Sequence, residues 1–425
     1  MMIRNTIIYV FLDVLSKASA LIILPLVTKS LSVESYGSYK FIMEFSIFVV
    51  MISTLGIGSS IARYNFDKLN IKRVYTLGYA TSLISIPISL ILLAFINYKH
   101  NISFSIGFMF TAISFLTMFN SYSRQFFTIN KKIKEFSIIK VVELVVFFLS
   151  IVAFYYFGML NIYSLLFSML MMVTANTVLS LSYASEIINF DYAGSFISVF
   201  SKIRKFSIDS YISGVVKYLN LNLEKIFFAF YLTGTGFGIY ALAVTIGTVV
   251  RTVGVALFLS FAPTYYENHR QGDCVGNQRI FKSLFFLAPI LYFVFIILVE
   301  LGWKYIIDGE YYESKKYVSV ISLIYTLEIY YGLTQYYWFQ IKNTEFLLKY
   351  EVLFFTLYSL CLGSIFVVNT LDLMSILYFI ASLTTSKIFI LVFYNKDHEL
   401  RKISSWMLGS IFFMVCILEI TNQGV

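Results

Sequence analysis

The fold of this chain is decided by the stretch FSIDSYISGVVKYLNLNLEKIFFAFYLTGTGFGIYAL, residues 206–242. The stretch is apolar enough to cross a bilayer, yet it holds four charged residues: Asp209, Lys217, Glu224 and Lys225. At spacings of three and four, five polar residues fall on one helical stripe: Ser210, Ser213, Lys217, Asn220 and Glu224. A charge at the bilayer centre costs roughly 2.5–3.5 kcal/mol on insertion scales, so we expect the stripe to face protein or water.

The end of this stretch repeats the beginning of the chain. A single offset aligns LTGTGFGIYAL at residues 232–242 with LSVESYGSYKF at residues 31–41, so that leucine, aromatic, glycine and tyrosine positions coincide. Each copy follows an apolar segment with a lysine part-way along it, Lys17 in the first and Lys217 in the second. The position of the two copies, at the start of each half, predicts a duplicated architecture.

The composition is that of a membrane protein. Apolar residues make up 59% of the chain and charged residues 13%, whereas a soluble domain has about 25% charged residues. The apolar runs are about twenty residues long, which favours helices over the short alternating strands of a barrel. We therefore predict an all-α integral membrane protein in the lipid bilayer.

The basic residues are distributed unevenly over the connections between spans. When the connections are assigned alternately, twenty lysines and arginines fall on one side and six on the other. Because positive loops stay in the cytoplasm, this bias places the N-terminus there and makes the chain multi-pass. It also explains the net charge of +9 without nucleic acid as a partner.

The spans fall into two sets of six. We predict an N-terminal lobe over 1–190, a cytoplasmic amphipathic linker over 191–206 and a C-terminal lobe over 207–395. The lobes share one orientation and so form a parallel repeat. A further span is expected over 403–421, with an interfacial helix as the alternative.

Several chemistries lack the residues that they need. The three cysteines and three histidines are scattered, so we expect no disulfide framework and no metal site. No glycine-rich loop ends in Gly-Lys-Ser/Thr, and we expect no nucleotide or other cofactor. Because the connections are short, we expect transport within the helices rather than a catalytic site.

Charged residues inside the spans are the main functional signal. Asp13 and Lys17, four residues apart, form either a neutral buried pair or a cavity-lining pair. Arg251 needs an anion, for which Asp13, Asp209, Glu224 or a substrate phosphate are candidates. Arg63 and Arg124 lie at cytoplasmic span ends, either as topology anchors and headgroup contacts or as substrate contacts. Glu328 lies on a polar stripe with Tyr331 and Gln335, and Lys387 is a candidate partner for it.

Three stretches resemble bacterial polysaccharide and O-antigen flippases (Wzx-type) of the multidrug/oligosaccharidyl-lipid/polysaccharide exporter superfamily. They are residues 24–41 with 55–67, residues 217–243, and GEYYESKKYVSVISL at 309–323. The resemblance implies a MATE-like fold with twelve core helices in two six-helix lobes around a central cavity. It also implies alternating access and export of undecaprenyl-pyrophosphate-linked oligosaccharide for O-antigen, capsule or a related glycan. The polymerase and chain-length regulator of the same pathway are implied as partners.

Relatives have a cationic cavity, so the resemblance assigns Lys17, Lys217 and Arg251 to substrate binding, with Arg63 and Arg124 nearer the cytoplasm. Without an ATP motif, transport needs an ion gradient or consumption of the substrate outside. A carboxylate in apolar surroundings takes up a proton more readily than one in water. The candidates for ion coupling or charge pairing are therefore Asp13, Asp209, Glu224 and Glu328.

Two other functions compete with this interpretation. A multidrug/cation antiporter of the same superfamily should have an acidic, aromatic cavity, whereas lysines and an arginine occupy these spans. A membrane polysaccharide polymerase resembles the chain in size and aromatic content. Such enzymes, however, carry a large periplasmic loop, and the longest outer loop here, about residues 302–316, is short.

Overall fold

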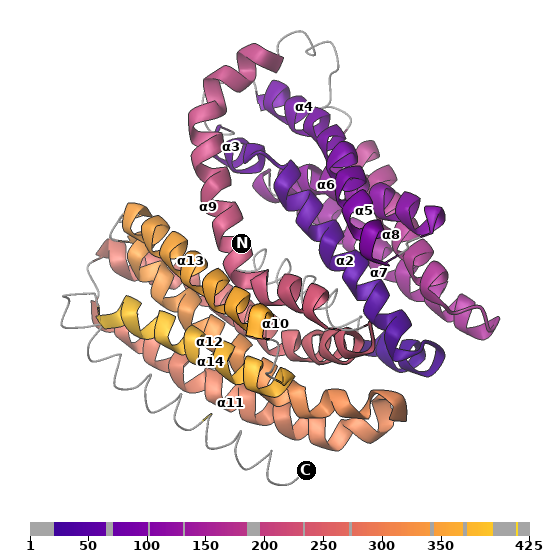
Figure 1. The fold of residues 1–425 in the computed structure, drawn as a ribbon. Coiled ribbons are helices and arrows are strands. Elements are labelled where there is room, and N and C mark those ends of the chain that lie inside the picture. The colour runs from indigo at the N-terminus through magenta and orange to yellow at the C-terminus, as the bar shows by residue number, and fades with distance from the viewer. Residues whose placement is uncertain are drawn as a thin grey trace. The chain divides into compact units, whose positions relative to one another are not determined.

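The computed structural model describes residues 21–64, 71–100, 103–130, 132–184, 196–232, 234–271, 274–340, 344–368, 372–393 and 414. Every regular element in these ranges is a helix (Figure 1), which confirms the all-α prediction. The contacts between helices divide the chain into two compact units.

One unit comprises Ser30–Phe230. Its helices are α2 (Val33–Ser53), α3 (Ile57–Tyr64), α4 (Ile71–Thr81), η1 (Ser82–Ile84), α5 (Ser85–His100), α6 (Phe104–Ile129), α7 (Ile133–Tyr156), α8 (Ile162–Ala184) and nearly all of α9 (Phe196–Tyr231). Within this unit α6 packs against both α7 and α8, and α2 packs against α6.

The other unit joins Met1–Lys29 to Tyr231–Val425. After the short apolar helix Leu21–Ser30, its elements are α10 (Gly234–Gln271), α11 (Cys274–Ile306), η4 (Gly309–Ser314), α12 (Lys315–Gln340), α13 (Thr344–Val368) and α14 (Leu373–Phe393). The central element is α12, because it packs against α10, α11, α13 and α14.

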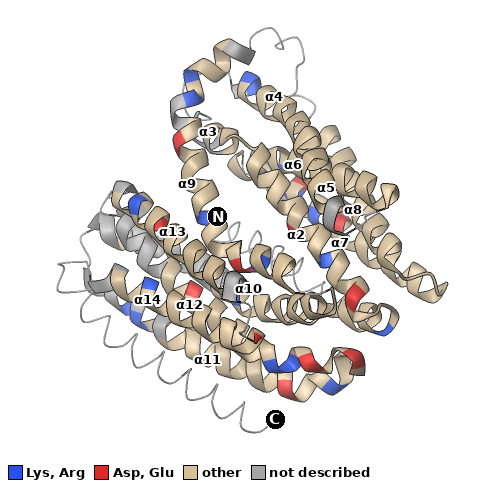
Figure 2. Cartoon of the chain, in the orientation of Figure 1, with Lys and Arg blue, Asp and Glu red and all other residues tan. Residues whose placement is uncertain are grey.

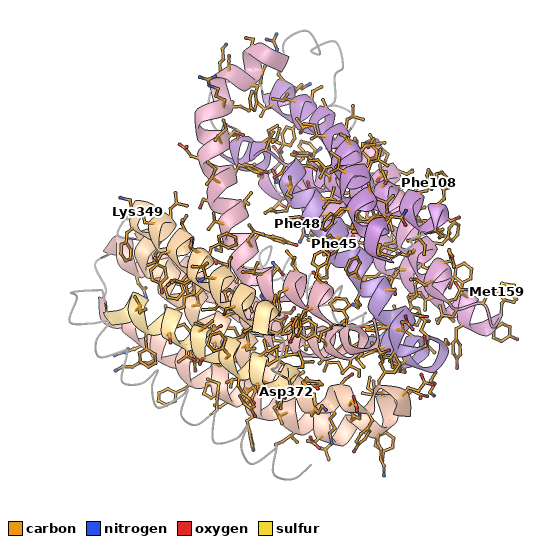
Figure 3. All side chains as sticks on the ribbon, in the orientation of Figure 1. Phe45, Phe48, Phe108, Met159, Lys349 and Asp372 are labelled. Atoms are coloured by element: carbon orange, nitrogen blue, oxygen red, sulfur yellow. The ribbon has the colours of Figure 1, made fainter. Side chains whose placement is uncertain are left out.

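The protein is a multi-pass membrane protein. Among the described residues, eight helical segments are long and apolar enough to cross a bilayer. Charged residues gather at helix ends, for example around η4 and the adjoining ends of α11 and α12 (Figure 2). In the Ser30–Phe230 unit, Phe108 and Met159 are exposed and point outward (Figure 3). Exposed apolar side chains of this kind suit contact with lipid rather than water.

Hydrogen bonds satisfy polar groups at several helix starts, as a lipid environment requires. The hydroxyl oxygen of Ser32 accepts a bond from the Ser35 N–H at 3.3 Å and caps α2. Asp372 lies at the start of α14 (Figure 3) and accepts a bond from the Ser375 hydroxyl. That hydrogen bond lowers the pKa of the Asp372 carboxyl below its ordinary value of 3.8.

Polar side chains also join helices to one another. The hydroxyls of Ser46 on α2 and Ser114 on α6 are 3.0 Å apart, and the Tyr292 hydroxyl on α11 donates to the Ser319 carbonyl on α12 at 3.2 Å. Because lipid tails are as apolar as the helices, such bonds and close packing hold membrane helices together. Each bond is worth about 0.6 kcal/mol on average.

The duplicated sequence is also duplicated in structure. Helices α2 and α10 begin at Val33 and Gly234, which are equivalent residues under the offset found in the sequence. The ring centroids of Tyr36 and Tyr39 are 6.4 Å apart at an interplanar angle of 46°, and those of their counterparts are 6.1 Å apart at 41°. The repeat therefore preserves a packing geometry as well as a sequence pattern.

Two helix boundaries differ from the spans expected from hydropathy. The second apolar run is broken after Ser53 by a turn in which Leu55 and Gly56 have positive φ angles of 47° and 70°. Helix α9 is continuous through residues 196–231, so the expected linker residues from 196 onward are helical. The domain limits 1–190, 191–206 and 207–395 stay a prediction, and the expected span 403–421 lies outside the described residues except for Met414.

Candidate functional site

The polar stripe predicted on residues 206–242 lies on α9. Asp209 and Lys217 are exposed, and Asn220 is half-buried. Glu224 is buried, with 6% of its surface exposed. The stripe thus passes from an exposed first half to a buried second half along one helix, so that Lys217 is accessible while Glu224 lies within the protein.

Next to this stripe, α9 and α2 share an ion pair and a ring contact. The ammonium of Lys225 lies 3.7 Å from the Glu44 carboxylate and donates a hydrogen bond to the Asn222 side-chain oxygen at 3.1 Å. About one turn farther along α2, the rings of Phe48 (labelled in Figure 3) and Tyr218 stack with centroids 6.4 Å apart. The contact between α2 and α9 therefore combines stacked aromatic rings with paired charges.

In the other unit, Arg251 on α10 pairs with Glu328 on α12. The guanidinium Nε lies 3.0 Å from the Glu328 carboxylate, and the side chains are 26% and 11% exposed. The guanidinium also lies over the ring of Tyr325, one turn earlier on α12, at 5.7 Å. Sequence reasoning singled out both charged residues but did not propose them as partners.

A second buried cluster joins α12, α13 and α14. Lys387 donates to the Glu351 carboxylate at 3.1 Å, and the two side chains are 12% and 7% exposed. The Tyr331 hydroxyl also donates to Glu351, and the Lys387 ammonium lies 4.0 Å above the Tyr331 ring. Lys387, considered from sequence as a partner for Glu328, thus pairs with Glu351.

These clusters place opposite charges together inside apolar helices. Desolvating a charge costs several kcal/mol, and attraction between the partners offsets this cost only where the geometry is close. Hydrophobic residues would pack such positions without this cost, so buried charge in a membrane helix is a mark of a functional site. Arg251 is the more exposed member of its pair and is the better placed of the two to meet a charged ligand.

The remaining predicted site residues are placed as follows. Asp13 and Lys17 lie outside the described residues, and Arg63 lies on α3 with a side chain that is not described. Arg124 is exposed on α6, with its guanidinium 5.7 Å from the centroid of the Phe136 ring on α7. It therefore takes part in the α6–α7 contact, and its role in substrate binding stays a prediction.

Sequence reasoning missed Glu351 as a member of a charged cluster. Glu351 lies two residues from Lys349 near the start of its span, where a charge is ordinary, so no local pattern distinguishes it. Within the described ranges, no group of three or more histidine, cysteine, aspartate or glutamate residues is placed to hold a metal ion.

The family model described as "Polysaccharide biosynthesis protein" matches residues 2–269, more than half of the chain. The chain belongs to the polysaccharide biosynthesis protein family. A protein of the Lsg locus of Haemophilus influenzae is 24% identical over 402 residues, which cover 89% of this chain and 98% of that one.

Solved structures show which fold this family member has. It is similar to an inward-facing MATE-family multidrug resistance transporter of the MOP superfamily, at a TM-score of 0.66 and 12% identity over 92% of this chain and 95% of that one. An outward-facing MATE structure matches at 0.61 and 12% identity, over 94% and 95%. A MOP superfamily transporter from Pyrococcus furiosus, described as having a binding pocket of reverse polarity, matches at 0.54 and 11%, over 95% of each chain.

The expected MATE-like fold is therefore confirmed. The chain is thus a multi-pass membrane protein of the polysaccharide biosynthesis protein family, with the fold of MATE transporters.

Proposed function

We propose that this protein is a transporter, a flippase that moves undecaprenyl-pyrophosphate-linked oligosaccharide repeat units across the bacterial cytoplasmic membrane. The product would be O-antigen, capsule or a related surface polysaccharide. The observation that carries the proposal is the Arg251–Glu328 pair, a partly exposed guanidinium inside a transporter of a polysaccharide biosynthesis family. The N-terminus would lie in the cytoplasm, and the polymerase and chain-length regulator of the pathway would receive the product.

The chemistry of the substrate explains why such residues are needed. A pyrophosphate and its sugars cannot cross hydrocarbon without losing hydration, at a cost of several kcal/mol for each unpaired polar group. Arginine replaces that hydration well, because its planar fork bonds two phosphate oxygens at once. The isoprenoid tail, in contrast, can stay in lipid throughout.

A cation that already has a carboxylate partner can bind an anion and then release it. When pyrophosphate occupies Arg251, the Glu328 carboxylate is repelled and needs a proton or a sodium ion to balance its charge. When Glu328 loses that cation, it attracts Arg251 again and the anion leaves. Alternating access driven by an ion gradient follows from this exchange, without ATP.

Lys217, an exposed cation on α9, stays a predicted member of the substrate's route. Lys17, its counterpart in the duplicated sequence, and Arg63 stay predicted members of this route. Asp13, Asp209 and Glu224 stay candidates for ion coupling. The stacked rings of Phe48 and Tyr218 offer a surface on which sugar rings can lie.

The test is transport of a lipid-linked oligosaccharide in proteoliposomes containing the full-length protein. We expect Arg251→Gln to lower the initial rate at least about tenfold, and Arg251→Lys to retain part of it. Glu328→Gln should bind substrate but lose its dependence on an imposed ion gradient. Lys315→Gln, which removes a 2.6 Å ion pair with Glu300 near the helix ends, is the matched control and should transport normally.

Transport of cationic dyes without transport of the glycolipid would refute the proposal and identify a multidrug/cation antiporter. In the native host, deletion of the gene should abolish surface glycan and leave lipid-linked repeat units on the cytoplasmic face. Single unpolymerised units at the surface would instead indicate a polymerase.

A further inference from the structure

A separate cavity of about 240 Å³ lies between α6, α7 and α8. Its lining is mixed: the polar and charged residues are Thr117, Asn120, Ser121, Arg124, Lys140, Glu143, Asn176 and Ser180. The rest of the wall is phenylalanine, methionine, isoleucine and valine. The transport mechanism proposed above makes no use of this cavity.

One side of the cavity is a hydrogen-bonded polar wall. Lys140 lies 2.9 Å from the Glu143 carboxylate, and the Asn176 amide donates to the same carboxylate at 3.2 Å. The Ser180 hydroxyl donates to the Asn176 carbonyl oxygen at 3.0 Å. These bonds fix the orientation of the Lys140 ammonium and the Asn176 amide, so the wall is organised before any ligand arrives.

The cavity lies near one end of the three helices, just inside the level of the lipid headgroups. Arg124 is five residues before the end of α6, Lys140 seven residues after the start of α7, and Asn176 eight residues before the end of α8. These three helix ends lie on the same side because the helices alternate in direction along the chain. At 1.5 Å per residue the polar wall lies about 8–12 Å below the helix ends. Helix α6, with 26 residues, is about 39 Å long and extends about 4–5 Å beyond a hydrocarbon core of about 30 Å at each end. The polar wall therefore lies a few ångströms inside the hydrocarbon, and the long Arg124 side chain can reach up to the headgroups.

The charge and the surroundings of the cavity point to the same class of ligand. The lining carries two cations, Arg124 and Lys140, against one carboxylate, Glu143, and is therefore positive overall. The rest of the lining is apolar and consists of Phe127, Phe136, Ile139, Met169, Met172 and Val173. A ligand with a negative head and an apolar tail fits both features.

We propose that this cavity binds the phosphate headgroup of an anionic membrane phospholipid, with the adjoining part of its acyl chains against the apolar lining. Basic pockets between membrane helices at the cytoplasmic side bind such headgroups, and the distribution of basic residues assigns these helix ends to that side. Arg124, exposed at the cavity, is the first contact for the phosphate. Lys140 then shares its ammonium between the phosphate and Glu143.

The polar wall alone would serve to hold three helices together. That role, however, needs neither a cavity of this volume nor a second cation in its lining. A bound metal cation is disfavoured, because the Lys140 ammonium already lies against the Glu143 carboxylate. Lipid binding therefore accounts for more of the geometry than either alternative.

The experiment is native mass spectrometry of the full-length protein in detergent, titrated with phosphatidylglycerol or phosphatidylcholine of matched acyl chains. We expect phosphatidylglycerol to bind at least about fivefold more tightly, as one effective positive charge predicts. Arg124→Gln should remove most of this preference. Glu143→Gln, which keeps an acceptor for Asn176 and makes the lining more positive, should strengthen it.

Lys134→Gln is the matched control, because Lys134 is an exposed cation in the first turn of α7 that does not line the cavity. It should leave lipid preference unchanged, and it and Arg124→Gln should melt like the wild type without added lipid. Glu143→Gln should melt at a lower temperature, because it removes one partner of a buried ion pair. Equal binding of the two lipids, or a preference that survives Arg124→Gln, would overturn the proposal. Displacement of phosphatidylglycerol by undecaprenyl phosphate would also overturn it, because the cavity would then bind the substrate's own headgroup.

Discussion

Replacing Glu351 by glutamine tests whether the α12–α13–α14 cluster stabilises the unit that contains Tyr231–Val425. The substitution leaves Lys387 with 12% of its side chain exposed and no carboxylate at 3.1 Å. Breaking a buried ion pair by removing one partner costs about 3–5 kcal/mol. The Tyr331 ring, 4.0 Å from the ammonium, offsets about 1–2 kcal/mol of this cost. We therefore expect Glu351→Gln to lower the free energy of unfolding by about 1–4 kcal/mol.

The double variant Glu351→Gln/Lys387→Met should recover most of that loss, because it leaves no buried charge behind. Unfolding by sodium dodecyl sulfate in mixed micelles, followed by circular dichroism, measures both free energies. The control is Glu300→Gln, which removes a pair whose carboxylate side chain is 42% exposed and should cost less than about 1 kcal/mol. A loss below about 1 kcal/mol for Glu351→Gln, or a double variant no more stable than the single one, would refute this reasoning.

Two further predictions concern turns and helix starts. Gly56→Ala should destabilise the Ser30–Phe230 unit by about 3 kcal/mol or more, because Gly56 has a φ of +70° and a Cβ there would overlap the Ser207 carbonyl. Gly158→Ala, at φ +67° but with no atom within 4 Å of a Cβ, should cost only about 1–2 kcal/mol; equal thermal shifts for the two variants would contradict the packing argument. Asp372→Ala should cost about 0.5–1 kcal/mol near neutral pH by removing a cap. The hydrogen bond from Ser375 lowers the pKa of Asp372 in the folded protein. The difference in unfolding free energy between the wild type and Asp372→Ala should therefore persist above pH 3.8 and shrink as the pH falls through that folded-state pKa. A difference that persists in strong acid would contradict a role of the ionised carboxylate.

Sequence reasoning reached the fold class because that information is local. Twenty-residue apolar runs require helices in lipid, whatever surrounds them. The offset between residues 31–41 and 232–242 indicated a repeat, and both copies do start a helix at the equivalent residue. The break after Ser53 was not visible, because hydropathy averages over a window and does not register two residues with positive φ.

Pairings between helices were beyond the reach of the sequence. A helical pattern shows on which face of a helix a residue lies, but not which other helix packs against that face. From the sequence, Arg251 could therefore pair equally well with Asp13, Asp209 or Glu224. The packing of α12 against α10 brings Glu328 to Arg251, and its contacts with α13 and α14 bring Glu351 to Lys387. The cavity of α6, α7 and α8 has the same origin, because its lining comes from three separate helices.

The sequence by itself thus determined which segments are helical, that they lie in a membrane, and that charged residues interrupt them at a cost. These properties depend on each segment's transfer between water and lipid, which composition fixes. Only the tertiary structure decided which charges neutralise one another and where a cavity remains between helices. Those outcomes depend on distances of a few ångströms between residues far apart in the chain, and Coulomb energy and packing are decided at that scale.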